Sequence, residues 1–304
     1  MNSGKLPKAL LFDAKALQNV DQISESGCYK HYTQSIHLNI EGKDLKRFLN
    51  DFFDQKNPFP LAENFFRCFI HELRHWVDMH CTCGGLSVLE HILRLRQSLL
   101  TNSDHEEIKK KNKAAIWSIK KNICMSKFIE KNINNSAQKW GVSITKSTPN
   151  KMSLKKFEHF SVILIDASTE KVICKSPIYL GSMMEANAVW QELSEGNALN
   201  AGAEGWPVER ACLSEEFSRF VYNPNFPEYY GLAHLIGTRS NNSDIYMAFK
   251  KASAISTFIL MMPDALLNQA VNEVYGKYAR EMPRNILSLG FKWPRACSEL
   301  SHSG

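Results

Sequence analysis

Residues 69–78 read Phe69-Ile-His-Glu-Leu-Arg-His-Trp-Val-Asp78, and the expected fold is built outward from this stretch. A helical step of 100° per residue places His71, His75 and Asp78 within about 60° of arc on one side. The opposite side carries the apolar residues of the segment, which are Phe65, Phe66, Phe69, Leu73, Trp76 and Val77. The pattern predicts an amphipathic helix over residues 62–80, with two histidines one turn apart on its polar face.

The two histidines and the glutamate beside them form the chemically informative pattern. Imidazoles at positions i and i+4 project from one face of a helix and can bind a single Zn2+ together. Glu72, which follows His71, is placed to take a proton from a metal-bound water and to pass it to a leaving amine. The alternative is a surface helix whose polar residues face water, and Asn64, Arg67 and Arg74 fit that alternative.

The segment His71-Glu72-x-x-His75 resembles the active-site helix of the zincin metallopeptidases. The resemblance implies a zinc cofactor held by His71 and His75, a catalytic role for Glu72, and a protein or peptide substrate. One residue departs from the family pattern, because Arg74 puts a charge at an inner position of the motif that is usually uncharged. A charge at this position argues against ordinary peptidase activity, but it does not change the spacing of the two histidines.

The third zinc ligand has several candidates. Glu185 is similar in placement to the glutamate that completes a gluzincin site from a later helix, so the resemblance favours it. Ser182-x-x-Glu185 is also a capping box, which needs no metal. Asp78 shares the helix face of the histidine pair and fits either a ligand or an acceptor for a ring N–H. Cys81 and His80 are further candidates, although Asp78 and Cys81 stand where a metzincin motif has Gly and His.

Hydrolysis through a metal-activated water also needs a donor for the negative charge that develops on the substrate. Three residues of one segment are candidates for that donor: Tyr229, Tyr230 and His234. The alternative is that all three are packing residues of an ordinary helix.

The rest of the chain predicts an α+β fold that is mainly helical. Two β-rich runs, Phe160–Ile165 and Lys171–Cys174, are separated by a five-residue loop and predict a hairpin. We expect a zincin-like catalytic region within residues 1–200, in which residues 101–150 form a lysine-rich helical insert. Residues 201–304 are expected to form a helical C-terminal region that can pack into the same domain.

Apolar spacing and turn residues predict the other elements. Gly84-Gly85 is expected to end the first helix. A second helix over Leu86–Leu100 is expected to bury one stripe, which consists of Leu89, Ile92, Leu93 and Leu100. Further predictions are a strand at Ser35–Ile40 and helices at Asp44–Gln55, 114–140, Ser182–Leu193, Glu215–Tyr222, Asp244–Met262 and Pro263–Met282.

The composition is that of a globular protein. The chain has 304 residues, of which 44% are hydrophobic and 22% charged, and these values exclude a disordered chain or a fibre. The net charge of +6 is spread along the chain, and residues 101–150 show no aromatic interleaving, so nucleic acid is not an expected partner. Residues 1–17 contain no long apolar run, and we expect a cytoplasmic protein that does not enter a membrane.

The sequence therefore predicts a zinc-dependent hydrolase, most simply a metallopeptidase that cleaves a protein or peptide. The alternative is a non-catalytic zincin-like scaffold, or a helical protein-interaction module in which the motif is incidental. The pattern specifies neither the substrate nor the oligomeric state.

Overall fold

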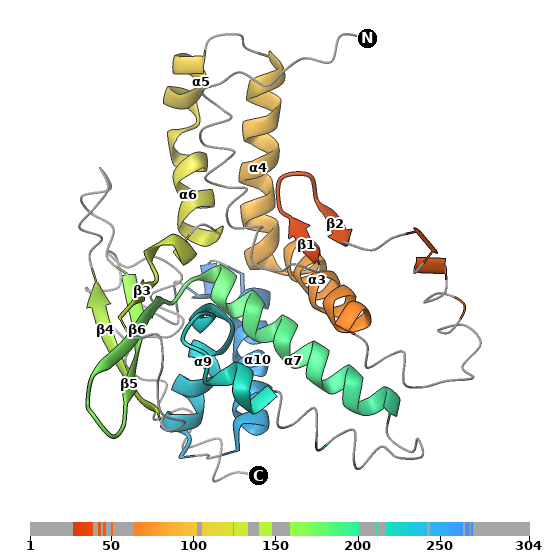
Figure 1. The fold of residues 1–304 in the computed structure, drawn as a ribbon. Coiled ribbons are helices and arrows are strands. Elements are labelled where there is room, and N and C mark those ends of the chain that lie inside the picture. The colour runs from red at the N-terminus through yellow and green to blue at the C-terminus, as the bar shows by residue number, and fades with distance from the viewer. Residues whose placement is uncertain are drawn as a thin grey trace.

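The computed structural model describes residues 27–38, 64–101, 105–123, 125–132, 140–147, 159–200, 217–241 and 244–263, with a few further isolated residues. Over these residues the molecule is mainly helical and carries two small antiparallel sheets, so the expected α+β class is confirmed (Figure 1). The helices predicted at 44–55 and 263–282 fall largely outside the described residues. Among the described helices, none combines the length and the apolar character that a membrane crossing requires.

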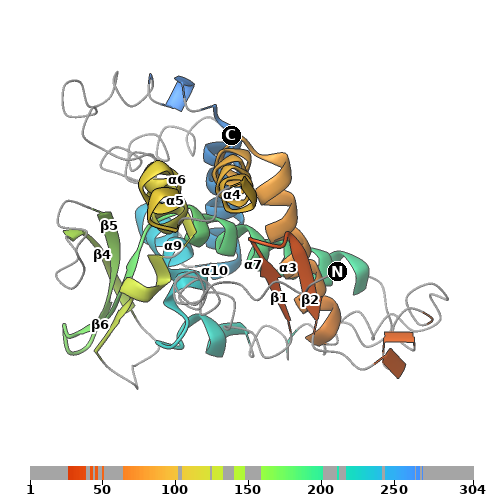
Figure 2. The ribbon, with the colours of Figure 1, turned by 90° about the horizontal axis from the view of Figure 1, so that it is seen from above.

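Helix α3 (Asn64–Cys81) carries the histidine motif and matches the helix predicted over residues 62–80. A two-stranded hairpin, β1 (Gly27–Lys30) and β2 (Ser35–Leu38), contacts α3. Cys68 of α3 approaches the hairpin so closely that a Cβ added to Gly27 would lie 2.6 Å from the Cys68 Sγ. Seen from above, the hairpin lies on the side of the helices away from the larger sheet (Figure 2).

The prediction that Gly84-Gly85 ends the first helix is wrong, because both glycines lie in the first turn of α4 (Cys83–Thr101). The break falls instead at Thr82, whose hydroxyl donates to the Asp78 carbonyl at 2.6 Å and accepts from the Gly85 N–H at 3.0 Å. A Cβ added to Gly85 would lie 2.1 Å from the Asp78 carbonyl oxygen. Glycine is therefore required here for the close approach of two helices rather than for a helix end.

Helices α4, α5 (His105–Lys111) and α6 (Lys113–Ile123) form an arm that projects from the rest of the molecule (Figure 1). The side of α4 that packs inward carries Val88, Leu89 and Ile92. The prediction that Leu93 and Leu100 join this stripe is wrong, since they are 49% and 88% exposed. The buried stripe of α4 is narrower than predicted because the helix packs against α3 and α6 over only part of its circumference.

A four-stranded antiparallel sheet has the order β3-β6-β5-β4. Its strands are β3 (Glu130–Lys131), β4 (Trp140–Ser147), β5 (His159–Asp166) and β6 (Val172–Pro177). The predicted hairpin is confirmed as the β5–β6 pair. The predicted helix over 114–140 is wrong beyond Ile123, because the chain forms a 3-10 turn at Met125–Phe128 and then strands β3 and β4. Trp140 pairs with Asp166 at the end of β5, so this segment completes the sheet.

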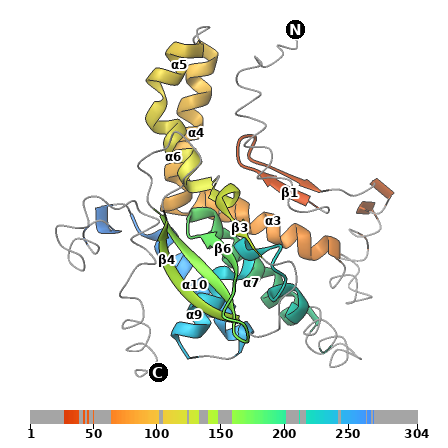
Figure 3. The ribbon, with the colours of Figure 1, turned by 60° about the vertical axis from the view of Figure 1, so that its left-hand side comes forward.

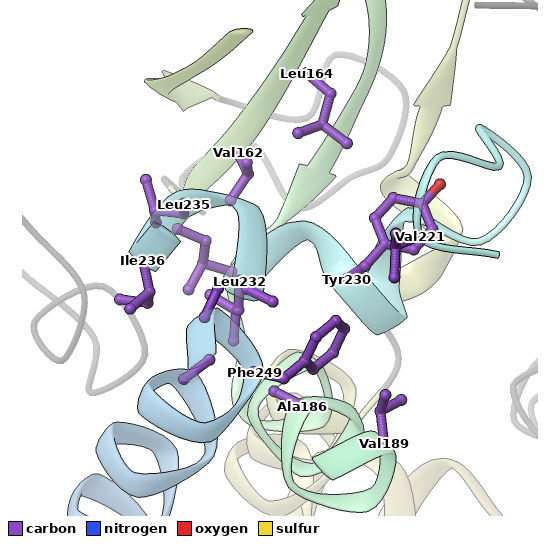
Figure 4. Close-up of a cluster of buried hydrophobic side chains, with 14 of the residues drawn as sticks. Val162, Leu164, Ala186, Val189, Val221, Tyr230, Leu232, Leu235, Ile236 and Phe249 are labelled. Carbon is purple, nitrogen blue, oxygen red and sulfur yellow. The ribbon is translucent and has the colours of Figure 1, made fainter. Parts of the chain in front are cut away.

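Helix α9 (Pro227–Arg239) packs on the sheet, and α7 (Leu180–Asn200) and α10 (Ile245–Met261) pack against α9 and against each other to complete the main core. The predicted helices at 182–193 and 244–262 correspond to α7 and α10. Figure 4 shows side chains from each of these elements meeting in one cluster, among them Val162, Leu164, Ala186, Val189, Leu232, Leu235 and Phe249. Helices on both sides of residue 200 therefore share this core.

Candidate metal centre

His71 and His75 of α3 meet Glu185 of α7 at a single point. One donor atom from each side chain can be chosen so that all three atoms lie within 4.8 Å of one another. The Glu185 Oε2 lies 3.2 Å from the Nε2 of His71 and 3.4 Å from the Nε2 of His75. The structure thus brings together the two motif histidines and the glutamate that the gluzincin resemblance favoured.

The polar face of α3 packs against α7 rather than facing water. His71 and His75 are both buried, and Glu72 and Asp78 on the same helix are buried as well. By contrast, Trp76 from the apolar side of α3 is 37% exposed. The surface-helix alternative does not fit this arrangement. Glu185 keeps 20% of its side-chain surface exposed, so part of this side chain is in contact with solvent.

Two further charged side chains hold His71 in place. Its Nδ1 lies 3.5 Å from the Glu192 Oε2, and Arg67 donates from Nε to the Glu192 Oε1 at 2.7 Å. Burial alone would lower the pKa of His71, but the carboxylates of Glu185 and Glu192 outweigh burial and raise that pKa to about 10. Burial likewise opposes ionisation of Glu185, yet the positive charge of His75 and His71 holds its pKa below the ordinary value.

Glu72 and Tyr229 lie beside this cluster. The ring of Tyr229 is 5.8 Å from the ring of His71. Burial raises the pKa of Tyr229 well above its ordinary value, and the nearby carboxylates of Glu185, Glu228 and Glu72 raise it further. The Tyr229 hydroxyl therefore remains protonated and can act as a donor.

The other two donor candidates are engaged elsewhere. The Tyr230 hydroxyl donates to the Asn223 carbonyl, and the His234 Nε2 donates to the Val221 carbonyl at 2.8 Å. Tyr230 is fully buried in the main core, and His234 packs edge-on to it. Of the three residues, the structure places only Tyr229 beside the histidine pair.

Asp78 belongs to a separate polar network. It accepts from Arg74 at 3.0 Å and from the Asn187 amide at 2.9 Å, and Ser253 of α10 donates to Asn187 at 2.9 Å. Arg74 also reaches Thr257 of α10 at 3.0 Å. The charge that departs from the zincin pattern is therefore bound by residues outside the candidate metal cluster and links α3 to α7 and α10.

The remaining ligand candidates also lie outside the cluster. Cys81 is exposed, and His80 stacks on Trp76 with 4.4 Å between ring centroids. The Ser182 hydroxyl bonds with the backbone N–H and carbonyl of Tyr179, at 3.0 Å and 2.8 Å. Ser182 thus lies inside α7 and does not serve as its N-cap, and Glu185 is turned toward the histidines instead of toward a capping box.

The donor set of the cluster fits a divalent transition metal. Two imidazoles and one carboxylate are the protein ligands of many catalytic zinc sites, and they leave one coordination position open. Both histidines direct Nε2 at Glu185, so the Nδ1 atoms carry the ring protons when a metal is bound. The protons now shared between the carboxylates and His71 are the ones that a metal ion would displace.

Sequence reasoning missed three residues around this cluster: Glu192, Arg67 as its partner, and His31. A signal for Glu192 exists, because it lies seven residues after Glu185 and two helical turns bring both onto one face. His31 follows β1 and gives no local signal. Tyr29 and Tyr32, on either side of His31, pack with Met79 of α3 and Met184 of α7, which puts His31 close to the cluster. Comparisons of the chain with protein-family models, curated proteins and solved structures give no match.

Proposed function

We propose that the chain is a zinc-dependent hydrolase that cleaves a protein or peptide. The convergence of His71, His75 and Glu185 from two helices carries the proposal, since the glutamate lies 110 residues along the chain from the second histidine. A zinc ion held by these ligands would polarise the scissile carbonyl and lower the pKa of a bound water toward about 7. The zincin resemblance and the partial exposure of Glu185 support the same function.

Glu72 and Tyr229 have the chemistry that the two remaining roles require. Glu72 follows His71 on α3, so its carboxylate is placed to accept a proton from the attacking water and to deliver it to the leaving amine. Tyr229 keeps its proton, and its hydroxyl can donate to the negative charge that develops on the carbonyl oxygen of the substrate. Glu192 and Arg67 keep the ring of His71 in the orientation that turns Nε2 toward Glu185.

Metal content is the first test of this proposal. The purified chain should bind one zinc ion per molecule, and Glu185→Gln should weaken that binding strongly. The same two-histidine, one-carboxylate donor set also suits Fe(II). Recovery of iron in place of zinc, by elemental analysis, would therefore contradict the hydrolase proposal and favour oxygen chemistry.

Hydrolysis is the second test, with Glu72→Gln as the decisive variant. The wild-type chain loaded with zinc is incubated with a peptide library, and products are read by mass spectrometry. Glu72→Gln should retain zinc and lose cleavage. Undiminished cleavage by this variant would reject Glu72 as the base. Zinc bound by the wild type with no cleavage of any peptide would favour the non-catalytic scaffold.

Tyr229→Phe separates transition-state stabilisation from metal binding. The substitution removes only the hydroxyl, so zinc content should be unchanged. Loss of one such donor typically lowers kcat by roughly 100- to 1,000-fold. A variant with wild-type kcat would show that another group supplies the donor.

A further inference from the structure

The two histidines of the motif are supported differently. His71 has Glu192 beside its Nδ1, and Arg67 holds that carboxylate. The Nδ1 of His75 is buried and has no hydrogen-bond partner among the described residues. A ligand histidine almost always donates its second ring N–H to an acceptor, which fixes the tautomer and the ring orientation. Unlike His71, His75 therefore lacks an acceptor for its second ring nitrogen among the described residues.

A second buried imidazole nitrogen without a partner lies close by. The Nδ1 of His31 is also buried and unpaired within the described part of the chain. His31 lies between Tyr29 and Tyr32, which pack in one cluster with Met79 of α3 and Met184 of α7. Met79 is one turn after His75, and Met184 precedes Glu185. The neutral form of an imidazole ring has one acceptor nitrogen. His31 is not part of the group formed by His71, His75 and Glu185, whose donor atoms lie within 4.8 Å of one another. We therefore treat His31 as a neighbour of the candidate ligands.

The position of His31 is fixed by the hairpin that carries it. Its ring packs edge-on to Tyr29, with 4.9 Å between the centroids, and Tyr29 is itself buried among core residues of α3 and α4. Both strands of the hairpin contact α3, and Gly27 at the start of β1 lies directly against Cys68. Figure 3 shows the hairpin seated alongside the helix that bears the histidine pair.

We propose that His31 is the positioning partner of His75: the His75 Nδ1–H donates to one bridging water, which in turn donates to the His31 Nδ1. The bond keeps the Nε2 lone pair of His75 directed at the metal position. A buried site with two unpaired polar atoms is one that a single water can satisfy. This inference rests on the proposed metal function and extends it, because it makes the hairpin a part of the metal centre.

The test measures zinc affinity by competition with a chromophoric chelator. His31→Phe fills the same space without an acceptor, whereas His31→Gln supplies a carbonyl oxygen. We expect His31→Phe to bind zinc roughly 10- to 100-fold more weakly than wild type, and His31→Gln to recover most of the loss. His37→Gln is the matched control, because His37 is an exposed histidine of the same hairpin and should leave affinity unchanged.

A purely structural role for His31 predicts a different outcome. In that case both His31→Phe and His31→Gln would change the unfolding midpoint of the metal-free chain. Neither variant would change the zinc affinity relative to wild type. Wild-type affinity in His31→Phe, alongside loss of binding in Glu185→Gln, overturns this inference and leaves the zinc site standing. A wild-type chain that binds no metal overturns both proposals. The Nδ1–H resonance of His75, observed by NMR, should shift in His31→Phe if the bond exists.

Discussion

Glu228 is the second residue of α9, it is buried, and its Oε2 has no hydrogen-bond partner among the described residues. Burial is the main cause that raises its pKa from 4.5 to about 7, and the negative charge of Glu185 contributes. Since the pKa is higher in the folded protein than in the unfolded chain, the folded protein binds the proton more tightly. Stability is therefore expected to fall as pH rises from about 4.5 through about 7. The shift corresponds to roughly 3 kcal/mol, most of which is lost between pH 5 and pH 8.

Glu228→Gln replaces the carboxyl group by an isosteric neutral amide and isolates this contribution. Unfolding by urea is followed at pH 5, 6, 7 and 8 in the presence of a metal chelator, so that ion binding does not enter. The free energy of unfolding of the variant, relative to wild type, should increase by roughly 2–3 kcal/mol over this range. Glu90→Gln, at an exposed glutamate of α4, is the control and should follow wild type at every pH. Parallel curves for Glu228→Gln and wild type would refute the reasoning.

Two further predictions concern the residues that support the cluster. Arg74→Met removes the guanidinium beside Asp78, whose side chain is fully buried, and should cost about 3–5 kcal/mol of stability in urea unfolding. Combining it with Asp78→Leu should recover a large part of that loss, and strictly additive effects would contradict the coupling. Glu192→Gln removes the charge that faces the Nδ1 of His71 and should weaken zinc binding roughly 10- to 100-fold in a chelator competition. Unchanged affinity would mean that the orientation of His71 does not depend on Glu192.

The elements predicted correctly from the sequence are those with a strong local pattern. The helix over 62–80 follows from apolar spacing, and the β5–β6 hairpin follows from two β-branched runs with a short polar loop between them. Asp244 was placed at the start of a helix, and its carboxylate indeed accepts from the Tyr246 N–H at 2.9 Å as an N-cap. In each case the residues that decide the structure lie within a few positions of one another.

The errors arise where distant segments decide. Strand β4 lies in the segment predicted to be helical, although Trp140, Val142 and Ile144 alternate with small or polar residues and pack against the core. This period-two pattern covers only three apolar residues, and the pairing with β5 completes the strand. Leu93 and Leu100 fit a helical stripe as well as Val88 does, and the positions of α3, α6 and α10 determine which side of α4 is covered. Gly85 gave a helix-end signal, although its actual requirement is the approach of the Asp78 carbonyl. Sequence spacing does not contain these tertiary constraints.

The residues of the candidate site also fall into two groups: those that local spacing predicts and those that depend on tertiary packing. The spacing of His71 and His75 follows from one helix, and it needs no tertiary information. Glu185 was favoured through a family resemblance, and its proximity to the histidines depends on how α3 packs on α7. Glu192, beside the second ring nitrogen of His71, lies two turns along α7 from Glu185, and His31, the proposed acceptor for His75, lies on the hairpin. No local pattern connects these residues to the motif.

The packing of α3 on α7 shows why Arg74 is compatible with the candidate metal cluster. The two helices run antiparallel, and polar contacts flank the cluster on both sides: Arg67 with Glu192 toward the start of α3, and Asp78 with Asn187 toward its end. A slip of α3 by one helical turn would move the Glu185 carboxylate about 5.4 Å relative to the imidazoles and would break both contacts at once. The network that contains Arg74 therefore fixes the register on which the three candidate ligands depend. A charge inside the motif is expected in a chain that uses one face of α3 to gather its ligands and an adjacent face to hold α7 and α10 in place.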